Sequence, residues 1–119
     1  MMKKGIFYIL IFINLLVGCG KGYEIEPNEL PNARVGQPYQ QSLIISGGKV
    51  IDKDNPLSTE IPENLGITVQ PVNDLDGYNI IEIKGTPKYK GIFKIHVLAG
   101  FYGGGSAEIN KEYTLTVED

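Results

Sequence analysis

The chain has 119 residues, of which 42% are hydrophobic, and a formal net charge of −3. This length corresponds to one small domain with a single core, and the acidic balance argues against a nucleic-acid-binding surface. The sole cysteine, Cys19, can form neither an internal disulfide nor a multi-cysteine metal site.

Residues 1–18 have the composition of a secretory signal peptide. Lys3 and Lys4 form a positive head, and the hydrophobic run GIFYILIFINLLVG follows at positions 5–18. This run is shorter than the ~20 apolar residues that cross a bilayer as a helix, and it ends in small residues, as cleaved signals do. We therefore expect residues 1–18 to be removed, which leaves nine basic and fourteen acidic residues in the mature chain.

The sequence LVGC at positions 16–19 resembles the lipobox of bacterial lipoproteins. In that family the signal is cleaved before the cysteine, whose thiol carries a diacylglycerol. The resemblance implies that Cys19 is a lipid attachment site and that the lipid bilayer of the bacterial cell envelope is its partner. Gly20 stands where an aspartate would retain such proteins in the inner membrane, which implies the outer membrane in a Gram-negative source.

An uncleaved membrane helix and a cysteine buried in the core are the alternative interpretations of this segment. Neither explains the change of composition at residue 20. An unpaired thiol is a liability in an oxidising compartment, and lipidation removes it. Two or more acyl chains give stable anchoring, so we interpret Cys19 as the membrane anchor.

The segment after Cys19 is predicted to be a tether. Residues 20–32 contain two glycines, two prolines and no helical period, a composition typical of a spacer. We therefore predict the lipidated cysteine and its tether at 19–29 and a folded domain at 30–119.

From residue 30 onward the sequence predicts an all-β fold. Apolar and polar residues alternate with a period of two, and glycine and proline recur too often for long helices. The residues predicted to face inward are Tyr39, Leu43, Ile45, Ile81, Ile83, Phe93, Ile95, Val97, Ala99, Tyr113, Leu115 and Val117. Several short strands at this spacing indicate an antiparallel β-sandwich, in which residues 101–110 would connect the last two strands as a hairpin.

Several phrases of this region carry a family resemblance. They are LPNARVGQPYQQSLIISGG at 30–48, IPENLGITV at 61–69, IKGTPKYKGIFKIHVLA at 83–99 and the closing YTLTVED. In this order they resemble the immunoglobulin-like (Ig-like) domains of bacterial surface and secreted proteins. The resemblance implies an Ig-like sandwich in which the Gly-Thr-Pro at 85–87 ends a strand. The chain departs from the pattern at Asn64, which replaces a glycine but tolerates positive φ, and at 70–79, which is longer than the usual link.

Catalytic and metal-binding interpretations have little support in the sequence. His96, the sole histidine, lies on the polar side of its predicted strand, and no serine lies in a Gly-x-Ser-x-Gly context. The pairs Asp52/Asp54 and Asp74/Asp76 have the alternate spacing of calcium ligands, but the remaining ligands of an EF-hand loop do not follow. A small sandwich also has little room for the carboxylate-lined cleft of a glycosidase. We predict a noncatalytic protein without metal or cofactor.

The loop between the last two predicted strands contains two aromatic residues, Phe101 and Tyr102, beside three glycines. They could pack under the hairpin, or they could stand exposed as a stacking surface for a sugar or a partner protein. Because sandwich domains often bind through their end loops, this pair is the candidate ligand-contact site.

These observations predict a membrane-anchored, noncatalytic lipoprotein that acts in binding, adhesion or envelope assembly. Its expected partners are an envelope protein or a polysaccharide, with contacts through loops or an exposed sheet edge. The alternative is a small inhibitor or protective lipoprotein that binds one enzyme or toxin. A hydrolase is a third class, which would depend on His96 or an acidic pair.

Overall fold

The computed structural model describes residues 22–119, which form eight strands and two short 3-10 helices. The strands are β1 (Glu24–Glu26), β2 (Ala33–Arg34), β3 (Tyr39–Ser46), β4 (Leu57–Thr59), β5 (Ile67–Pro71), β6 (Ile80–Gly85), β7 (Gly91–Gly100) and β8 (Glu108–Glu118), and the 3-10 helices are η1 (Glu63–Leu65) and η2 (Gly77–Asn79). The predicted all-β fold is confirmed. The predicted signal peptide and Cys19 lie outside the described residues.

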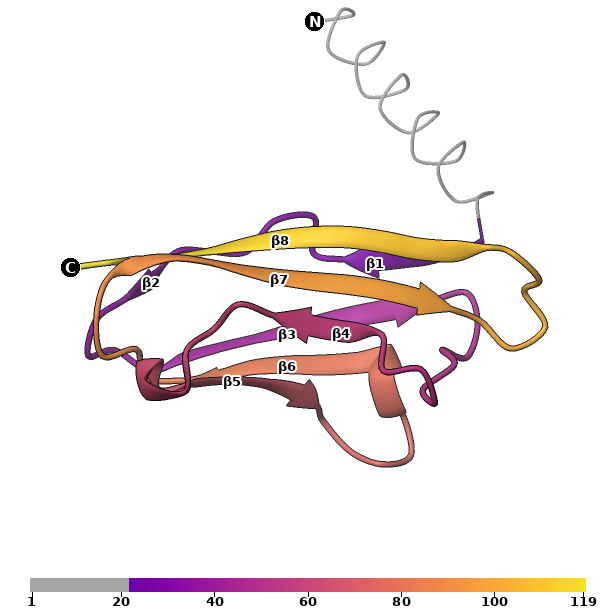
Figure 1. Ribbon diagram of the computed structural model, residues 1–119, viewed down its shortest axis with the longest axis horizontal. Helices are drawn as coiled ribbons and strands as arrows, with labels where there is room; N and C mark the ends of the chain where they lie inside the picture. The colour runs from indigo at the N-terminus through magenta and orange to yellow at the C-terminus, as the bar shows by residue number, and fades with distance from the viewer. Residues whose placement is uncertain (1–21) are drawn as a thin grey trace, which may run out of the picture.

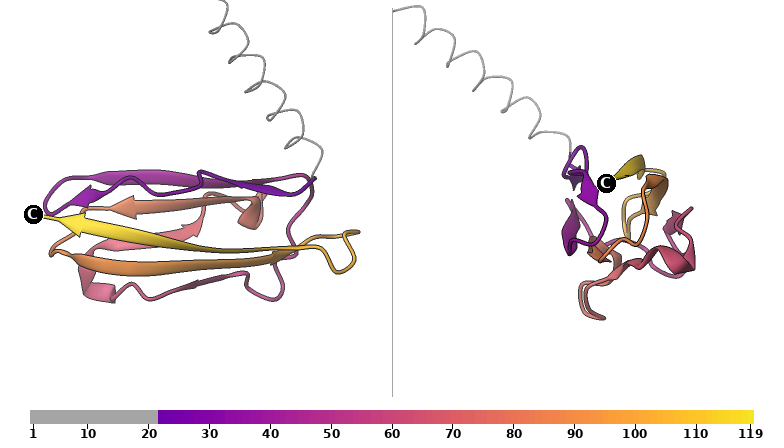
Figure 2. Two further views of the ribbon diagram at one scale, coloured as in Figure 1. Left: turned by 90° about the horizontal axis from the view of Figure 1, so that it is seen from above. Right: turned by 90° about the vertical axis from the view of Figure 1, so that its left-hand side faces the viewer.

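The strands form two four-stranded sheets that pack face to face (Figures 1 and 2). One sheet has the order β1-β3-β6-β5 and the other the order β2-β8-β7-β4. Neighbouring strands are antiparallel except β2 and β8, which are parallel. This is the strand order of an immunoglobulin-type sandwich whose first strand is divided between the two sheets as β1 and β2. The predicted Ig-like sandwich is therefore the observed fold.

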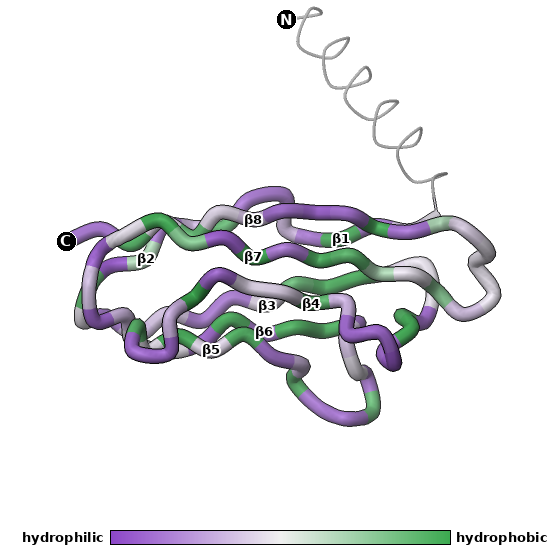
Figure 3. Tube along the Cα trace, viewed as in Figure 1, coloured by the Kyte–Doolittle hydropathy of each residue, from purple (hydrophilic) through white to green (hydrophobic). Residues whose placement is uncertain are grey.

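The core lies between the sheets and consists of every second residue of the strands. In β7, Phe93, Ile95, Val97 and Ala99 are buried, whereas Leu98 is exposed. All the residues predicted to face inward are buried. In Figure 3 much of the hydrophobic colour lies on the strands, and the loop between β5 and β6 is largely hydrophilic. The period-two pattern therefore identifies the core correctly.

The folded domain begins earlier than the sequence predicts. Residues Glu24–Glu26 fall in the predicted tether, 19–29, but they form β1 and pair with β3. Tyr23 and Ile25 pack against the core, and the glutamates between and after them face solvent. This alternation covers only a few residues before Pro27, too few to distinguish a strand from a spacer. The boundary at residue 30 is thus corrected to about residue 23.

Two glycines that contact each other are required where β6 ends. β6 ends at Gly85, as predicted for the Gly-Thr-Pro motif, with a φ of +142°, and a Cβ there would overlap the carbonyl of Gly66. Gly66 follows η1 with a φ of +95°. The positive φ of this segment therefore lies at Gly66 and not at Asn64, whose side-chain oxygen accepts a hydrogen bond from the Tyr89 hydroxyl (2.7 Å).

We expect Ile83→Ala to lower the free energy of unfolding by about 2–5 kcal/mol, because Ile83 is fully buried and its truncation leaves a cavity. Ile92→Ala is the matched control. Ile92 is 68% exposed on β7, so its truncation should change stability by less than about 0.5 kcal/mol. Urea denaturation measures both values, and equal destabilisation by the two substitutions would contradict the assignment of inner and outer faces.

Candidate functional site

The predicted contact loop presents one aromatic side chain to solvent, not two. Phe101 is 2% exposed and stacks on Tyr23, with 3.8 Å between the ring centroids. Tyr102 is 55% exposed at the start of the glycine-rich turn between β7 and β8. Because Phe101 covers the end of the core, only Tyr102 of this pair is open to a ligand.

Asp76 of the acidic pair Asp74/Asp76, in the loop between β5 and β6, is hydrogen-bonded within the fold. Asn73 Nδ2 donates to Asp76 Oδ2 (2.9 Å), and the Asp76 N–H donates to Asn73 Oδ1 (2.7 Å). Lys49 Nζ donates to the main-chain carbonyls of Leu75 (3.3 Å) and Asp76 (3.0 Å), so an ammonium already occupies the position near these oxygens. Across residues 22–119, no three His, Cys, Asp or Glu side chains are grouped so that they could hold a metal ion.

His96 lies on the outer face of the second sheet. The register places Ser58 of β4 and Glu112 of β8 directly beside it. However, His96 Nε2 lies 2.6 Å from Asn110 Oδ1, so the imidazole is hydrogen-bonded to an amide and not to the serine or the carboxylate. A catalytic nucleophile and its base need a direct hydrogen bond and a pocket that positions the substrate. The row of Ser58, His96 and Glu112 lies on the outer face of a sheet and has no such hydrogen bond, so it gives the hydrolase hypothesis no support.

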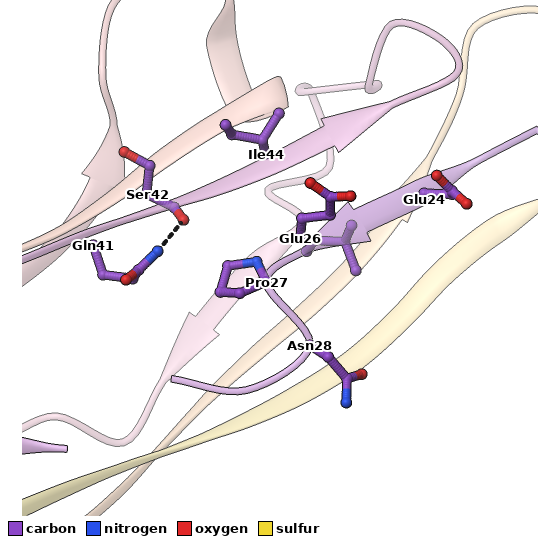
Figure 4. A pocket seen from close by; sticks show the side chains of 8 residues that line it. Glu24, Glu26, Pro27, Asn28, Gln41, Ser42 and Ile44 are labelled. Atoms are coloured by element: carbon purple, nitrogen blue, oxygen red, sulfur yellow. Dashed lines mark hydrogen bonds between the residues drawn. The ribbon is translucent and has the colours of Figure 1, made fainter. Parts of the chain in front are cut away.

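A groove opens beside β3 where β1 stops short. β1 pairs with β3 only over Ile44–Ser46, because the chain turns away at Pro27, which has no N–H to donate to a sheet. Within the described part of the chain, residues 40–43 of β3 have no strand next to them on this side. The groove has a volume of about 740 Å³ and is lined by Glu24, Ile25, Glu26, Pro27, Asn28, Gln41, Ser42 and Ile44 (Figure 4).

The main-chain groups of Ser42 point into this groove. On the opposite side of β3, the carbonyl of Ile45 accepts a hydrogen bond from Asn79 Nδ2 (2.9 Å) of η2. Because main-chain groups point alternately to the two sides of a strand, Ser42 faces the side of β1. Its carbonyl accepts a hydrogen bond from Gln41 Nε2 (3.0 Å), which Figure 4 shows as a dashed line. A flexible amide thus occupies the position that a neighbouring strand would take.

The second sheet also has an open edge, but that edge is charged. β2 pairs with β8 only at Val117 and Glu118, so the preceding part of β8 has no partner strand on that side among residues 22–119. Lys111 of β8 lies in the inward register, and its Nζ donates to Asn28 Oδ1 (2.9 Å). Charged side chains on an edge, above all inward-pointing ones, oppose the addition of another strand. By contrast, residues 40–43 of β3 carry no charge.

An exposed apolar patch adjoins the groove on the outer face of the first sheet. Ile44 of β3 pairs with Ile80 of β6, whose carbonyl accepts the Val72 N–H, so these three residues form one cross-strand row. Ile44 is 48% exposed, and Leu75 in the adjacent loop is 87% exposed. We call these four residues the Ile44 patch. In Figure 3 hydrophobic colour covers β3 and β6 where they approach η2.

The predicted contact residues, Phe101 and Tyr102, are not part of this surface. A usable signal exists in the pairs Ile44-Ile45 and Ile80-Ile81, because strand alternation sends one isoleucine of each pair to the outer face. The open edge of β3 has no comparable signal. It depends on how far β1 pairs with β3, which only the arrangement of the two sheets determines.

Two buried tyrosines hold the crossover, which is the segment 27–32 that links β1 to β2. The Tyr113 hydroxyl donates to the carbonyl of Pro27 (2.6 Å), and the Tyr39 hydroxyl donates to the carbonyl of Pro31 (2.8 Å). One tyrosine comes from each sheet, so the crossover is attached to both. Burial raises the pKa of Tyr39, and it raises the pKa of Tyr113 to about 12. Only the neutral phenol can donate, and these pKa shifts favour that form.

Comparisons with known proteins identify no relative, since no family model, curated protein or solved structure matches this chain. Within the part of the chain that the structure describes, no helix is both long and hydrophobic enough to pass through a bilayer.

We expect stability to fall between about pH 10 and pH 12. An unfolded tyrosine loses its proton near pH 10, whereas folded Tyr113 keeps its proton up to a pKa of about 12. The stabilisation is therefore complete below pH 10 and is lost as the pH rises through the folded pKa. Tyr113→Phe should make this fall shallower, and it should cost about 1 kcal/mol at neutral pH because the Pro27 carbonyl loses its donor.

Thermal unfolding followed by circular dichroism from pH 8 to pH 12 measures both effects. Tyr102→Phe is the control, because it removes a hydroxyl from a half-exposed ring and should preserve the wild-type pH profile. A Tyr113→Phe profile parallel to that of the wild type would contradict the assigned role of this hydroxyl.

Proposed function

We propose that this chain is a noncatalytic, lipid-anchored binding module of the bacterial cell envelope, and that it binds an extended segment of an envelope protein at the open edge of β3. The observation that carries the proposal is the uncharged stretch 40–43 of β3, which among residues 22–119 has a partner strand on one side only and borders a groove of about 740 Å³ on the other. An extended peptide can add to such an edge as a further strand. Main-chain hydrogen bonds then supply affinity, and contacts with alternate side chains supply specificity.

The groove favours a segment with both basic and apolar side chains. Glu24 and Glu26 line it and would attract lysine or arginine. The Ile44 patch lies next to it and would accept an apolar side chain, as exposed apolar patches at binding sites do. None of the eight lining residues is aromatic, so a sugar ring would find no stacking surface there. These features favour a protein over a polysaccharide as the partner.

The envelope location is supported by the sequence. A positive head, a short hydrophobic run and the LVGC motif precede the folded domain, and Cys19 is the only thiol. The observed sandwich also agrees with the resemblance to Ig-like domains of bacterial surface proteins, which serve as binding, adhesion or spacer modules. Fold alone does not determine function, and the groove and the patch are the features that favour a binding role.

We expect metabolic labelling with a palmitate analogue to mark the wild-type protein and to leave Cys19→Ser unlabelled, because serine lacks the thiol that receives the diacylglycerol. Mass spectrometry of the wild-type product should find a mature chain that begins at residue 19. A product that still begins at Met1, or equal labelling of both proteins, would refute the proposed anchor.

We expect a photo-crosslinking amino acid at Ser42, in the groove, to capture an envelope protein in intact cells, whereas the same group at Thr114, on the outer face of β8, should not. Ile44→Ser should lower the capture at Ser42 by roughly tenfold, which corresponds to about 1.4 kcal/mol of lost apolar contact.

Ile92→Ser is the matched control, because it removes an isoleucine that is also exposed but lies on the other sheet. Equal capture at Ser42 and Thr114, or equal loss in the two serine variants, would contradict binding at this site. Capture of one enzyme in stoichiometric amount would instead make the chain an inhibitor.

A further inference from the structure

Tyr23 is the point at which the chain enters the fold. Its ring stacks on Phe101 with 14° between the ring planes. It also packs closely against the two turns at this end of the sandwich, since a Cβ at Gly48 or at Gly104 would lie 2.8 Å from a Tyr23 ring or hydroxyl atom. In Figures 1 and 2 the chain enters beside the turn between β7 and β8, at the end opposite to the C-terminus. Tyr23 is therefore fixed at one end of the sandwich.

The chain between the proposed anchor and Tyr23 is short. Only three residues separate Cys19 from Tyr23. Whatever its conformation, a segment of this length spans at most roughly 14 Å. β8 has 11 residues and is thus about 36 Å long. A lipid on Cys19 would therefore keep the Tyr23 end of the sandwich close to the bilayer, while the opposite end could reach the bilayer only if the domain lay on its side.

The end that contains Tyr23 is suited to contact a bilayer. Residues 101–107 carry no charge, and the neighbouring turn 46–48 carries none either. Tyr102 is half-exposed on this end, and tyrosine prefers the headgroup level of membranes because its ring is apolar and its hydroxyl is polar. Gly103 and Gly105 have φ values of +74° and +63°, with open space around them. They let this turn project without bulky side chains.

The charges of the domain oppose the sideways orientation. Glu108, which pairs with Gly100, borders the turn 101–107, and Asp54 lies near it. The long side formed by β1 and the open edge of β8 carries four carboxylates, Glu24, Glu26, Glu29 and Glu112, with Lys111 among them. Anionic headgroups would repel these carboxylates if this side lay flat on the bilayer. Lys21 is the one charged residue between the proposed anchor and the fold, and it is attracted to the same headgroups. Charge therefore favours contact through the end of the sandwich.

We propose that the turn 101–107 rests on the bilayer, with Tyr102 at the level of the lipid headgroups, so that the sandwich stands on the membrane by this end. This inference rests on the proposed lipidation of Cys19 and extends it, because it gives the domain one orientation. In this orientation the groove beside β3 opens to the side of the domain, neither toward the bilayer nor away from it.

The test uses the full-length lipidated protein, purified and reconstituted in vesicles of phosphatidylethanolamine and phosphatidylglycerol. Acylation removes the only native thiol, so one introduced cysteine is a unique site for an environment-sensitive fluorophore. Three variants place it at the membrane end, at the opposite end and on the long side: Tyr102→Cys, Lys88→Cys and Glu26→Cys. All three native side chains are exposed, so the labels should not disturb the core. Lipids with a nitroxide on the headgroup then quench fluorophores that lie near them.

We expect quenching at position 102 to be several times greater than at positions 88 and 26, together with a blue-shifted emission at 102. Vesicle flotation reports separately on the anchor. Protein that floats while its label at 102 stays unquenched, or is quenched no more than the label at 26, overturns the orientation but leaves the anchor intact. Protein that does not float overturns the anchor and this inference with it.

Discussion

β1 ends at Glu26 because the next residue, Pro27, has no N–H with which to continue the sheet. The chain then crosses from the edge of one sheet to the edge of the other, where β2 pairs with β8. Tyr39 and Tyr113, one from each sheet, donate to carbonyls of the crossover and attach it to both layers. The division of one strand between two sheets completes the sandwich, but it leaves part of an edge open in each sheet.

The two open edges differ in how readily each could accept another strand. On β8, Lys111 points inward beside the crossover and discourages another strand. On β3, the one group among residues 22–119 that donates to the Ser42 carbonyl from the groove side is the amide of Gln41, and an incoming main-chain N–H could replace it. Two copies that paired through this edge would bring Glu24 and Glu26 close to their counterparts, and like charges at an interface are unfavourable. The acidic groove thus disfavours self-association, whereas a basic partner gains from it.

The sequence predicts most of this fold because its signals are local. Phe93, Ile95 and Val97 alternate with polar or exposed residues over a long strand, so their burial follows from the period of two. Gly85 likewise ends β6 where the Gly-Thr-Pro motif indicates. The sequence does not predict β1, because its alternation is brief and lies next to Pro27, and because its pairing with β3 is a contact between distant segments.

The candidate site also depends on contacts between distant segments. Phe101 and Tyr102 are adjacent and both aromatic, but the partner that buries Phe101 is Tyr23, which is 78 residues earlier in the chain. The groove beside β3 lies where the described part of the chain places no strand next to residues 40–43, and no residue pattern encodes this feature. The sequence pattern therefore indicates which residues are buried, while the pairing of distant strands determines which surfaces remain accessible to a partner.

The position of the groove relative to the proposed anchor restricts the partner further. Glu24, the first residue that lines the groove, comes five positions after Cys19, and β1 adds only about 10 Å to the reach of the preceding segment. The groove would therefore lie within roughly 25 Å of the bilayer. A partner segment held in the same membrane would meet it at a high effective concentration, so that even a short added strand could bind stably. A freely diffusing peptide would lack this advantage, which makes a membrane-bound envelope protein the partner that the geometry favours.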